Sequence, residues 1–312
     1  MRIGLNTDSL GGLSLEAMLD VAAELSMDAV EFPTGAWSPA PHVDLDALLD
    51  SAAARRELLA RVTDRDLEIS ALTCNGNQLD PASGPAHDDV VRKTIALAPR
   101  LGVDRVIAMS GCPGGPGDRW ANWITVAWPP ETAEVLRWQW EQAVIPYWRS
   151  LVEHATAHDV SRLCIEMHGQ QVVYSVPTLL RLREAVGPVV GANYDPSHLM
   201  WMGADPLAAI EALGDAIYHV HAKDTRIEPA VALSSRLETL PNSRADARAW
   251  NYVTLGRGHG PEFWREFCAA LRQAGYDDVL SIEHEDQTMD PVEAVTESVD
   301  LLRGVVAERL VR

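Results

Sequence analysis

The sequence is short of positive charge and of long apolar runs. Its 26 lysines and arginines face 45 aspartates and glutamates, which gives a formal net charge of −19 at pH 7. Such a surface repels phosphate backbones, so we expect no nucleic-acid binding. No apolar run approaches the roughly 18 residues that cross a bilayer. The N-terminus enters a strand pattern without the apolar segment of a signal peptide. We therefore expect a soluble, cytoplasmic protein with no membrane partner.

Cysteine is scarce and scattered. The four cysteines, Cys74, Cys112, Cys164 and Cys268, include no Cys-x-x-Cys pair. This distribution argues against a disulfide framework and against a zinc–thiolate site. The first expected strand is not followed by a Gly-x-Gly-x-x-Gly motif, which disfavours a dinucleotide-binding fold.

What the chain has instead is a regular alternation of short apolar segments and helical patterns. The expected strands cover residues 2–6, 28–32, 67–73, 105–109, 164–169, 189–195, 217–221 and 279–283. The expected helices cover residues 13–26, 44–66 in two pieces, 88–101, 131–158, 176–186, 205–213, 261–274 and 291–310. Asp88 lies near the expected N-cap of one helix, and Gly102 follows its end as a stop signal. A polar stretch occupies residues 225–251.

Strict alternation implies parallel strands joined by helical crossovers. Eight such units in 312 residues favour a closed (β/α)8 TIM barrel over an open doubly wound sheet. The Pro- and Gly-rich stretches fall between strands and helices, where barrel loops belong. We therefore predict a single α/β domain over residues 1–312, with its active site at the carboxyl ends of the strands.

One expected loop, residues 110–130, is unusually long and contains Trp120, Trp123 and Trp128. A loop of this length in a compact domain is commonly a functional lid or disordered. Tryptophan side chains are costly to leave in water, which favours an ordered lid. Simple aromatic packing beneath the loop is the alternative.

Four successive expected strands end in residues that bind metals. They are Glu166, Asp195, His221 and Glu283, and each ends an apolar run. A single glutamate at a strand end is more often a loop cap or an ion-pair partner. Four together are expensive to bury unless an ion compensates their charge. Carboxylate and imidazole ligands without thiolate suit Mn2+, Co2+, Mg2+ or Zn2+.

Three strings around these residues resemble the xylose isomerase-like TIM barrels. They are NYDPSHLMW (193–201), HVHAKDT (219–225) and LSIEHED (280–286). That superfamily contains the sugar phosphate isomerase/epimerase group, including the ketose 3-epimerases. The resemblance implies that Glu166, Asp195, His221 and Glu283 hold one divalent ion, with Mn2+ favoured. It also implies that His198 contacts substrate oxygens.

The same resemblance implies a reaction. Removal of a proton next to a sugar carbonyl gives an enediolate, whose charge a bound cation stabilises. Epimerisation then needs a base on one face and an acid on the other. In the ketose 3-epimerases the two metal-bound glutamates take these roles, which fall here on Glu166 and Glu283. We therefore expect a metal-dependent isomerase or epimerase of a sugar or keto-sugar.

The chain departs from the ketose 3-epimerases at two positions. Val172 stands where that group has a second glutamate, and Ile227 where it has an arginine, for which Arg226 is a possible substitute. The chain has His168 two residues after Glu166, and on a strand such residues face the same side. A catalytic His168 and a structural one are both open.

A related branch, the large subunits of C-glycoside deglycosidases, uses the same metal set for elimination from 3-keto-glucosides. The long tryptophan loop, with Trp120, would suit an aryl glycoside substrate. A metal-dependent 3-keto-glycoside lyase is therefore our alternative function, and a non-catalytic sugar-binding protein is a more remote one. Endonuclease IV, a DNA-repair member of the superfamily, needs a basic groove, which the net charge disfavours.

Two further basic residues are candidates for substrate binding. Lys223 follows His221 by two residues and could reach substrate or a metal carboxylate, or form a surface ion pair. Arg257 lies in the Gly-rich stretch 256–260 before a helix, where backbone N–H groups could hold an anion, although a tight turn is the simpler reading. Superfamily members often pair through the active-site face, so a homodimer or a small partner subunit is open. The expected ligand is a small sugar or glycoside.

Overall fold

The computed structural model describes residues 1–307, and eight parallel strands within this range form a closed barrel. Around the barrel the strands run in the order β1-β10-β7-β6-β5-β4-β3-β2. In chain order they are β1 (Arg2–Asn6), β2 (Ala29–Pro33), β3 (Glu68–Thr73), β4 (Arg105–Met109), β5 (Arg162–Glu166), β6 (Val190–Tyr194), β7 (Ile217–Ala222) and β10 (Val279–Ile282). This confirms the predicted (β/α)8 barrel.

The α-helices of the described residues follow the strands. They are α1 (Leu15–Glu24), α2 (Leu45–Asp50), α3 (Ala52–Thr63), α4 (Gly84–Leu97), α5 (Glu131–Trp138), α6 (Ile145–Ala157), α7 (Val176–Val186), α8 (Pro196–Met202), α9 (Pro206–Leu213), α10 (Pro261–Gln273) and α11 (Pro291–Ala307). Within residues 1–307, none of them is long and apolar enough to cross a membrane. The predicted last helix runs to residue 310, and its end lies outside the described residues.

The chain divides into two compact units, which we describe separately. Unit 1 comprises Met1–Glu31, Arg61–Ser70 and the chain from Tyr194 onward, and unit 2 comprises Phe32–Ala60 and Ala71–Asn193. Strands β2, β3 and β6 each contribute residues to both units. The single domain over residues 1–312 stays a prediction.

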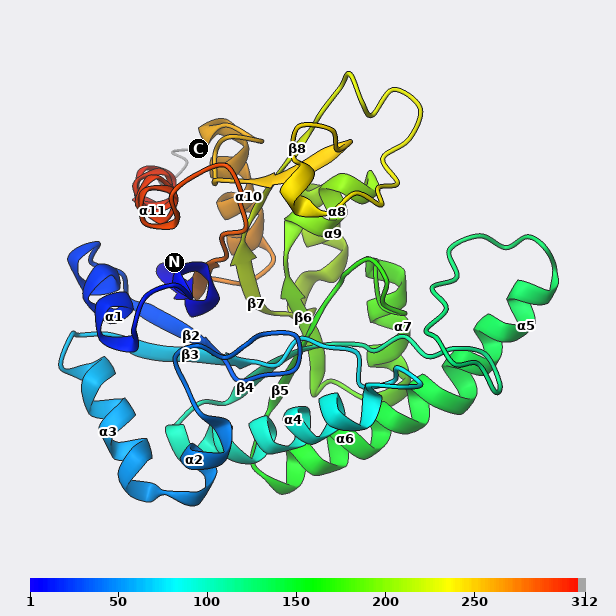
Figure 1. Ribbon diagram of the computed structural model, residues 1–312, viewed down its shortest axis with the longest axis horizontal. Helices are drawn as coiled ribbons and strands as arrows, with labels where there is room; N and C mark the ends of the chain where they lie inside the picture. Colours follow the sequence, from blue (N-terminus) through cyan, green and yellow to red (C-terminus); the bar gives the residue numbers. More distant parts are fainter. Residues whose placement is uncertain (308–312) are drawn as a thin grey trace. The chain divides into compact units, whose positions relative to one another are not determined.

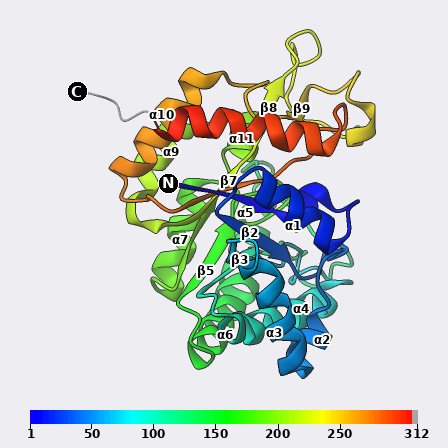
Figure 2. The same ribbon diagram turned by 90° about the vertical axis from the view of Figure 1, so that its left-hand side faces the viewer.

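In unit 1, β1 pairs with β10, and β10 pairs with β7. All residues of β10 are buried, as expected for a continuous apolar strand of a parallel sheet. Helices α10 and α11 lie side by side in both views (Figures 1 and 2). Trp264 and Phe267 of α10 are fully buried, with ring centroids 5.1 Å apart.

Unit 1 also contains an antiparallel hairpin that the sequence does not reveal. It joins β8 (Asp224–Ile227) to β9 (Trp250–Val253), and these strands bracket the stretch predicted to be merely polar. Both strands are four residues long and are separated by a long connection, so no hairpin turn signal marks them. Figure 1 shows this connection, in yellow, extending away from the hairpin.

In unit 2, β4 and β5 pair over their whole length, ending at Met109 opposite Glu166. The predicted helix over residues 131–158 is two α-helices joined by the π-helical segment Gln139–Val144. The buried Gln139 side chain donates to the backbone carbonyls of Pro113 and Asn122 at 2.9 and 2.8 Å. Hydrogen bonds from Gln139 therefore connect the long tryptophan loop to this segment.

One predicted helix start is wrong. Helix α4 begins at Gly84, with Ser83 at its N-cap and a proline in its first turn. Proline is preorganised for that position, so it outweighs the weaker signal of Asp88. Asp88 lies inside the helix and pairs with Arg92 at 3.0 Å. Gly102 has φ +75° and stops the helical segment as predicted.

Candidate metal centre

In unit 1, three of the predicted ligands lie together at the carboxyl ends of β6, β7 and β10. Asp195 directly follows β6, His221 is the second-last residue of β7, and Glu283 directly follows β10. Each offers a ligand atom within 4.8 Å of the others. His221 Nδ1 lies 3.0 Å from Glu283 Oε2. Asp195 and His221 are buried, and the Glu283 side chain is 16% exposed. Glu283 is therefore the most exposed of the three side chains.

Asp195 is oriented by the start of α8. Its Oδ1 accepts the N–H of Ser197 at 2.8 Å, and Pro196 occupies the first helical position. An aspartate N-cap followed by proline is a strong helix start. Asp195 Oδ2 lies 3.1 Å from His198 Nε2, so the predicted substrate-contacting histidine is buried against a predicted ligand.

Lys223 is buried between carboxylates. Its Nζ lies 3.2 Å from Glu283 Oε2 and 2.5 Å from Glu285 Oε1. Burial alone would lower the pKa of Lys223, but Glu283, Glu285 and Asp195 raise it well above its ordinary value. Lys223 is therefore an ammonium ion at neutral pH. Lys223 therefore lies against Glu283, a predicted metal ligand, and does not form a surface ion pair.

Tyr252 lies on strand β9, which has no counterpart among the predicted strands, and it contacts both Lys223 and His198. Its ring lies 4.4 Å from Lys223 Nζ, a cation–π contact. Its hydroxyl lies 2.9 Å from His198 Nδ1. Burial chiefly raises the pKa of Tyr252 well above its ordinary value, so the phenol stays protonated. Because Tyr252 comes from a hairpin with no turn signal, no sequence pattern could have assigned it to the site.

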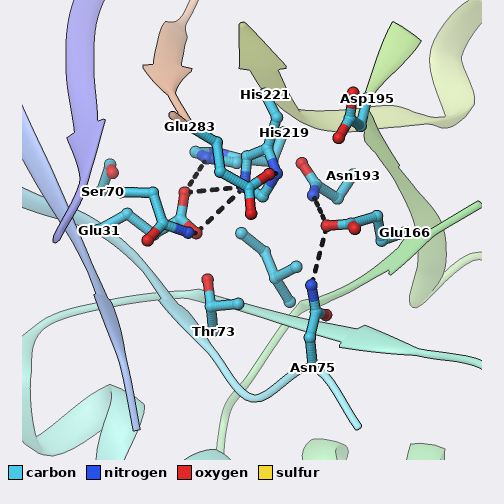
Figure 3. A network of polar contacts seen from close by, with 12 residues as sticks. Glu31, Ser70, Thr73, Asn75, Glu166, Asn193, Asp195, His219, His221 and Glu283 are labelled. Atoms are coloured by element: carbon cyan, nitrogen blue, oxygen red, sulfur yellow. Dashed lines mark hydrogen bonds and ion pairs between the residues drawn. The ribbon is translucent and has the colours of Figure 1, made fainter. Parts of the chain in front are cut away.

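A second residue that the sequence did not reveal is Glu31, on β2. Glu31 Oε1 accepts the Asn6 side-chain N–H at 2.9 Å. Its carboxylate lies 2.9 Å from His219 Nε2 and 3.1 Å from His221 Nε2. Figure 3 shows both histidine rings directed at this carboxylate. The sequence signal was present, since Glu31 is a charged residue inside an otherwise apolar strand, but its partners are almost 190 residues away.

In unit 2, Glu166 is the last residue of β5 and is buried. Its Oε2 accepts side-chain N–H groups of Asn75 at 2.9 Å and of Asn193 at 3.0 Å (Figure 3). Asn193 is the residue paired with Glu166 across β5 and β6. The two amides hold one carboxylate oxygen, which fixes the orientation of the other.

His168 does not lie on a strand, because β5 ends at Glu166. The rule that residues two apart face the same side therefore does not apply to this pair, and this premise of the prediction is wrong. The half-buried ring of His168 contacts the carbonyl of Gly169 through Nδ1 in the following turn.

The Gly-rich loop around Arg257 already holds an anion, and it is a carboxylate of the chain. Asp224 Oδ2 accepts the backbone N–H groups of Gly256, Gly258 and His259 at 3.0, 3.0 and 2.9 Å. A Cβ on Gly258 would lie 2.6 Å from Asp224 Oδ1, so glycine is required there. Arg257 itself points to the surface and pairs with Glu297 at 3.0 Å.

Two other predicted substrate contacts lie at the surface. Arg226 is 47% exposed and pairs with Glu228 at 2.7 Å. Trp120 is 71% exposed, on the loop of unit 2, with Arg119 over its ring at 5.8 Å. In contrast, Trp123 packs edge-on against Tyr174, with centroids 5.6 Å apart. The loop therefore both buries and exposes its tryptophans.

The donor set of unit 1 fits a divalent ion. An ionised Glu31 can only accept hydrogen bonds, so the hydrogen of a neutral His221 lies on Nε2. Nδ1 then presents a lone pair to the Glu283 carboxylate, 3.0 Å away. The same Glu283 oxygen also lies 3.2 Å from the Lys223 ammonium. Imidazole nitrogen with carboxylate oxygens is a ligand set for Mn2+, Co2+ or Zn2+.

The family follows from the whole chain. The model of the "Xylose isomerase-like TIM barrel" family matches residues 19–305. The chain belongs to this family. Among the known proteins similar to this family member is "Uncharacterized protein YfiH" of Bacillus subtilis (strain 168), 47% identical over 313 residues, which are 99% of the chain and 100% of that protein.

Two further similar proteins have names that state an activity. The inosose dehydratase of Geobacillus kaustophilus (strain HTA426) is 34% identical over 86 residues, which are 25% of this chain and 28% of that protein. The solved structure of an L-ribulose 3-epimerase matches 100% of this chain and 99% of its own, with a TM-score of 0.63 and 19% identity. The latter shows a shared fold. The neighbours of this xylose isomerase-like barrel thus include epimerases and dehydratases.

The buried ammonium of Lys223 makes a testable prediction. Lys93 and Lys223 are the two lysines of the sequence, and Lys93 is 36% exposed. Under native conditions, reductive methylation should modify Lys93 and leave Lys223 unmodified, because the Lys223 amine is both enclosed and held protonated. Peptide mass mapping measures both sites in one sample, with denatured protein as the control for reactivity. Equal modification of the two lysines in native protein would contradict the burial of Lys223 against Glu283.

Proposed function

We propose that this protein is a divalent-metal-dependent enzyme that removes a proton next to the carbonyl of a sugar or keto-sugar, and that it isomerises or epimerises its substrate. The observation that carries the proposal is the group formed by Asp195, His221 and Glu283, with the Lys223 ammonium beside it. A bound divalent ion would supply Lewis-acid stabilisation of negative charge on substrate oxygens.

Glu166 is the proposed fourth ligand. It ends β5 opposite Asn193 of β6, and Asp195 follows Asn193 by two residues in the same strand end. Its carboxylate is buried. Asn75 and Asn193 occupy one oxygen of Glu166, so the other oxygen is the one proposed to face the ion.

The side chains divide the chemical tasks. Glu283 is the most exposed of the proposed ligands, so its carboxylate is the proposed base that takes the proton from substrate carbon. Glu166 is the proposed acid–base group for the opposite face, as two-faced proton transfer requires. Lys223 is charged at neutral pH and therefore donates hydrogen bonds to substrate oxygen that becomes anionic.

His198 is proposed to bind a substrate hydroxyl, since its ring is held between Asp195 and Tyr252. A ring fixed at both nitrogens loses little freedom when substrate binds. His168 stays a proposed second acid–base group, at the turn after β5. Arg226, Arg257 and Trp120 stay predicted substrate contacts, although both arginines have acidic partners at the surface.

Elimination is the second candidate function. Proton removal next to a carbonyl is also the first step of losing water or a glycosidic leaving group, and inosose dehydratase is similar to part of this chain. The exposed Trp120 favours a leaving group with an aromatic ring, since an exposed indole can stack on one. The alternative is therefore a 3-keto-glycoside lyase or dehydratase with the same proposed base.

Metal analysis tests the ligand set. Purified Glu283→Ala should lose the stoichiometric divalent ion, because a carboxylate ligand is removed. We expect affinity for Mn2+ to fall by more than the roughly 100-fold that loss of a merely orienting residue costs. Glu285→Ala is the matched control, since Glu285 contacts the same lysine but is not a proposed ligand, and it should keep the ion. Equal metal content in both variants would refute the role of Glu283.

Solvent deuterium separates the two candidate reactions. The Mn2+-loaded protein is incubated in D2O with ketohexoses and, separately, with aryl 3-keto-glucosides, and the products are analysed by NMR and mass spectrometry. Isomerisation or epimerisation predicts deuterium on carbon in recovered sugar, whereas elimination predicts release of aglycone. Glu283→Ala should do neither. Metal-loaded protein that binds these compounds without either product would favour a non-catalytic sugar-binding protein.

A further inference from the structure

Glu31 is the most enclosed carboxylate near the proposed metal centre. It is fully buried, and its β2 position is paired with Asn6 of β1. Three side chains surround its oxygens, with Asn6 Nδ2 at 2.9 Å, His219 Nε2 at 2.9 Å and His221 Nε2 at 3.1 Å. His219 and His221 are two residues apart on β7, so both rings face the same side of the strand.

Both oxygens of the Glu31 carboxylate have N–H neighbours. The Asn6 amide donates to Oε1, His219 Nε2 lies 2.9 Å from Oε2, and His221 Nε2 lies 3.1 Å from Oε1 and 3.2 Å from Oε2. A carboxylate surrounded in this way acts as the acceptor, so each histidine presents an Nε2–H group to it. In a neutral ring the other nitrogen, Nδ1, then has no hydrogen.

The two nitrogens of His221 face different carboxylates. Nε2 faces the fully buried Glu31, and Nδ1 faces Glu283, which is 16% exposed. A carboxylate that accepts from one ring nitrogen directs the other nitrogen at a metal and makes it more basic. The ring plane is held as well, since the rings of His219 and His221 meet at 86° with centroids 5.8 Å apart.

We propose that Glu31 is a positioning residue of the metal centre: it holds His221 as the Nε2–H tautomer and thereby presents Nδ1 as the metal ligand. This inference rests on the proposed metal centre. His219 contacts the second oxygen of Glu31 and thereby keeps the carboxylate oriented toward His221.

A rival arrangement would place a second ion among Glu31, His219 and His221, which also offer closely spaced ligand atoms. The contacts of Asn6 favour the positioning role. Its amide donates to Glu31 Oε1, the oxygen that lies 3.1 Å from His221 Nε2. A donor at that oxygen supports a hydrogen-bonded carboxylate, whereas an ion there would compete with it.

The test uses Glu31→Gln, which keeps the shape but replaces one acceptor oxygen with an NH2 group. In metal-free protein labelled with 15N-histidine, NMR should show only Nε2–H tautomers for His219 and His221 in the wild type. Glu31→Gln should populate the Nδ1–H form of one of them. Calorimetric titration with Mn2+ should show affinity reduced about 10- to 100-fold with unchanged stoichiometry.

The control is Glu297→Gln, the same substitution at an exposed residue of unit 1, and it should leave the tautomers and the affinity unchanged. If Glu31→Gln does not fold, Glu31→Asp takes its place in the test. Aspartate keeps the charge on a shorter side chain, so this variant should fold and should show an intermediate loss of Mn2+ affinity.

Three outcomes would overturn the inference. If wild-type protein binds two ions and Glu31→Gln binds one, Glu31 is a ligand of a second ion. If the variant keeps both the tautomers and the affinity, Glu31 does not position His221, while the proposed function stands. If wild-type protein binds no Mn2+, the metal centre itself fails, and the proposed function fails with it.

Discussion

The structure of this site depends on one imidazole placed between two carboxylates. His221 has Glu31 at Nε2 and Glu283 at Nδ1, at 3.1 and 3.0 Å. A fully buried negative charge is unstable unless donors or cations compensate it, and Glu31 receives three donors. The other ring nitrogen faces Glu283, whose Oε2 also lies 3.2 Å from the Lys223 ammonium. A neutral ring that donates from Nε2 has a lone pair at Nδ1, which is the arrangement that histidine ligands of metals adopt.

The residues around His221 and Glu283 set the charge of this group. Lys223 places one buried positive charge beside Glu283 and Glu285, so the acidic group retains more negative than positive charge. Tyr252 covers the ammonium with its ring and holds His198 with its hydroxyl. The hairpin that supplies Tyr252 therefore contacts two residues of the proposed site, although it lies outside the barrel. The same charge balance suits a reaction that develops negative charge on substrate oxygen.

The sequence predicted the barrel and the ends of its strands because a buried strand followed by a polar residue is a local pattern. Asp195, His221 and Glu283 were placed at strand ends in this way, and the structure has them there. Glu31 and Tyr252 were missed because their roles depend on partners that only strand order brings near, and because β8 and β9 are short and far apart in sequence. The loop around Arg257 was ambiguous for a similar reason, since its anion is the distant Asp224.

The central claim is that one divalent ion is bound between Asp195, Nδ1 of His221 and Glu283, with Glu166 as the fourth ligand. Anomalous X-ray diffraction from crystals of the full chain grown with Mn2+ tests it most directly. We expect one manganese peak within bonding distance of these four side chains, with Glu31 hydrogen-bonded to His221 Nε2 and not to the ion. A manganese ion bound by Glu31 and His219, or by surface carboxylates while Asp195 and Glu283 bind none, would contradict the account.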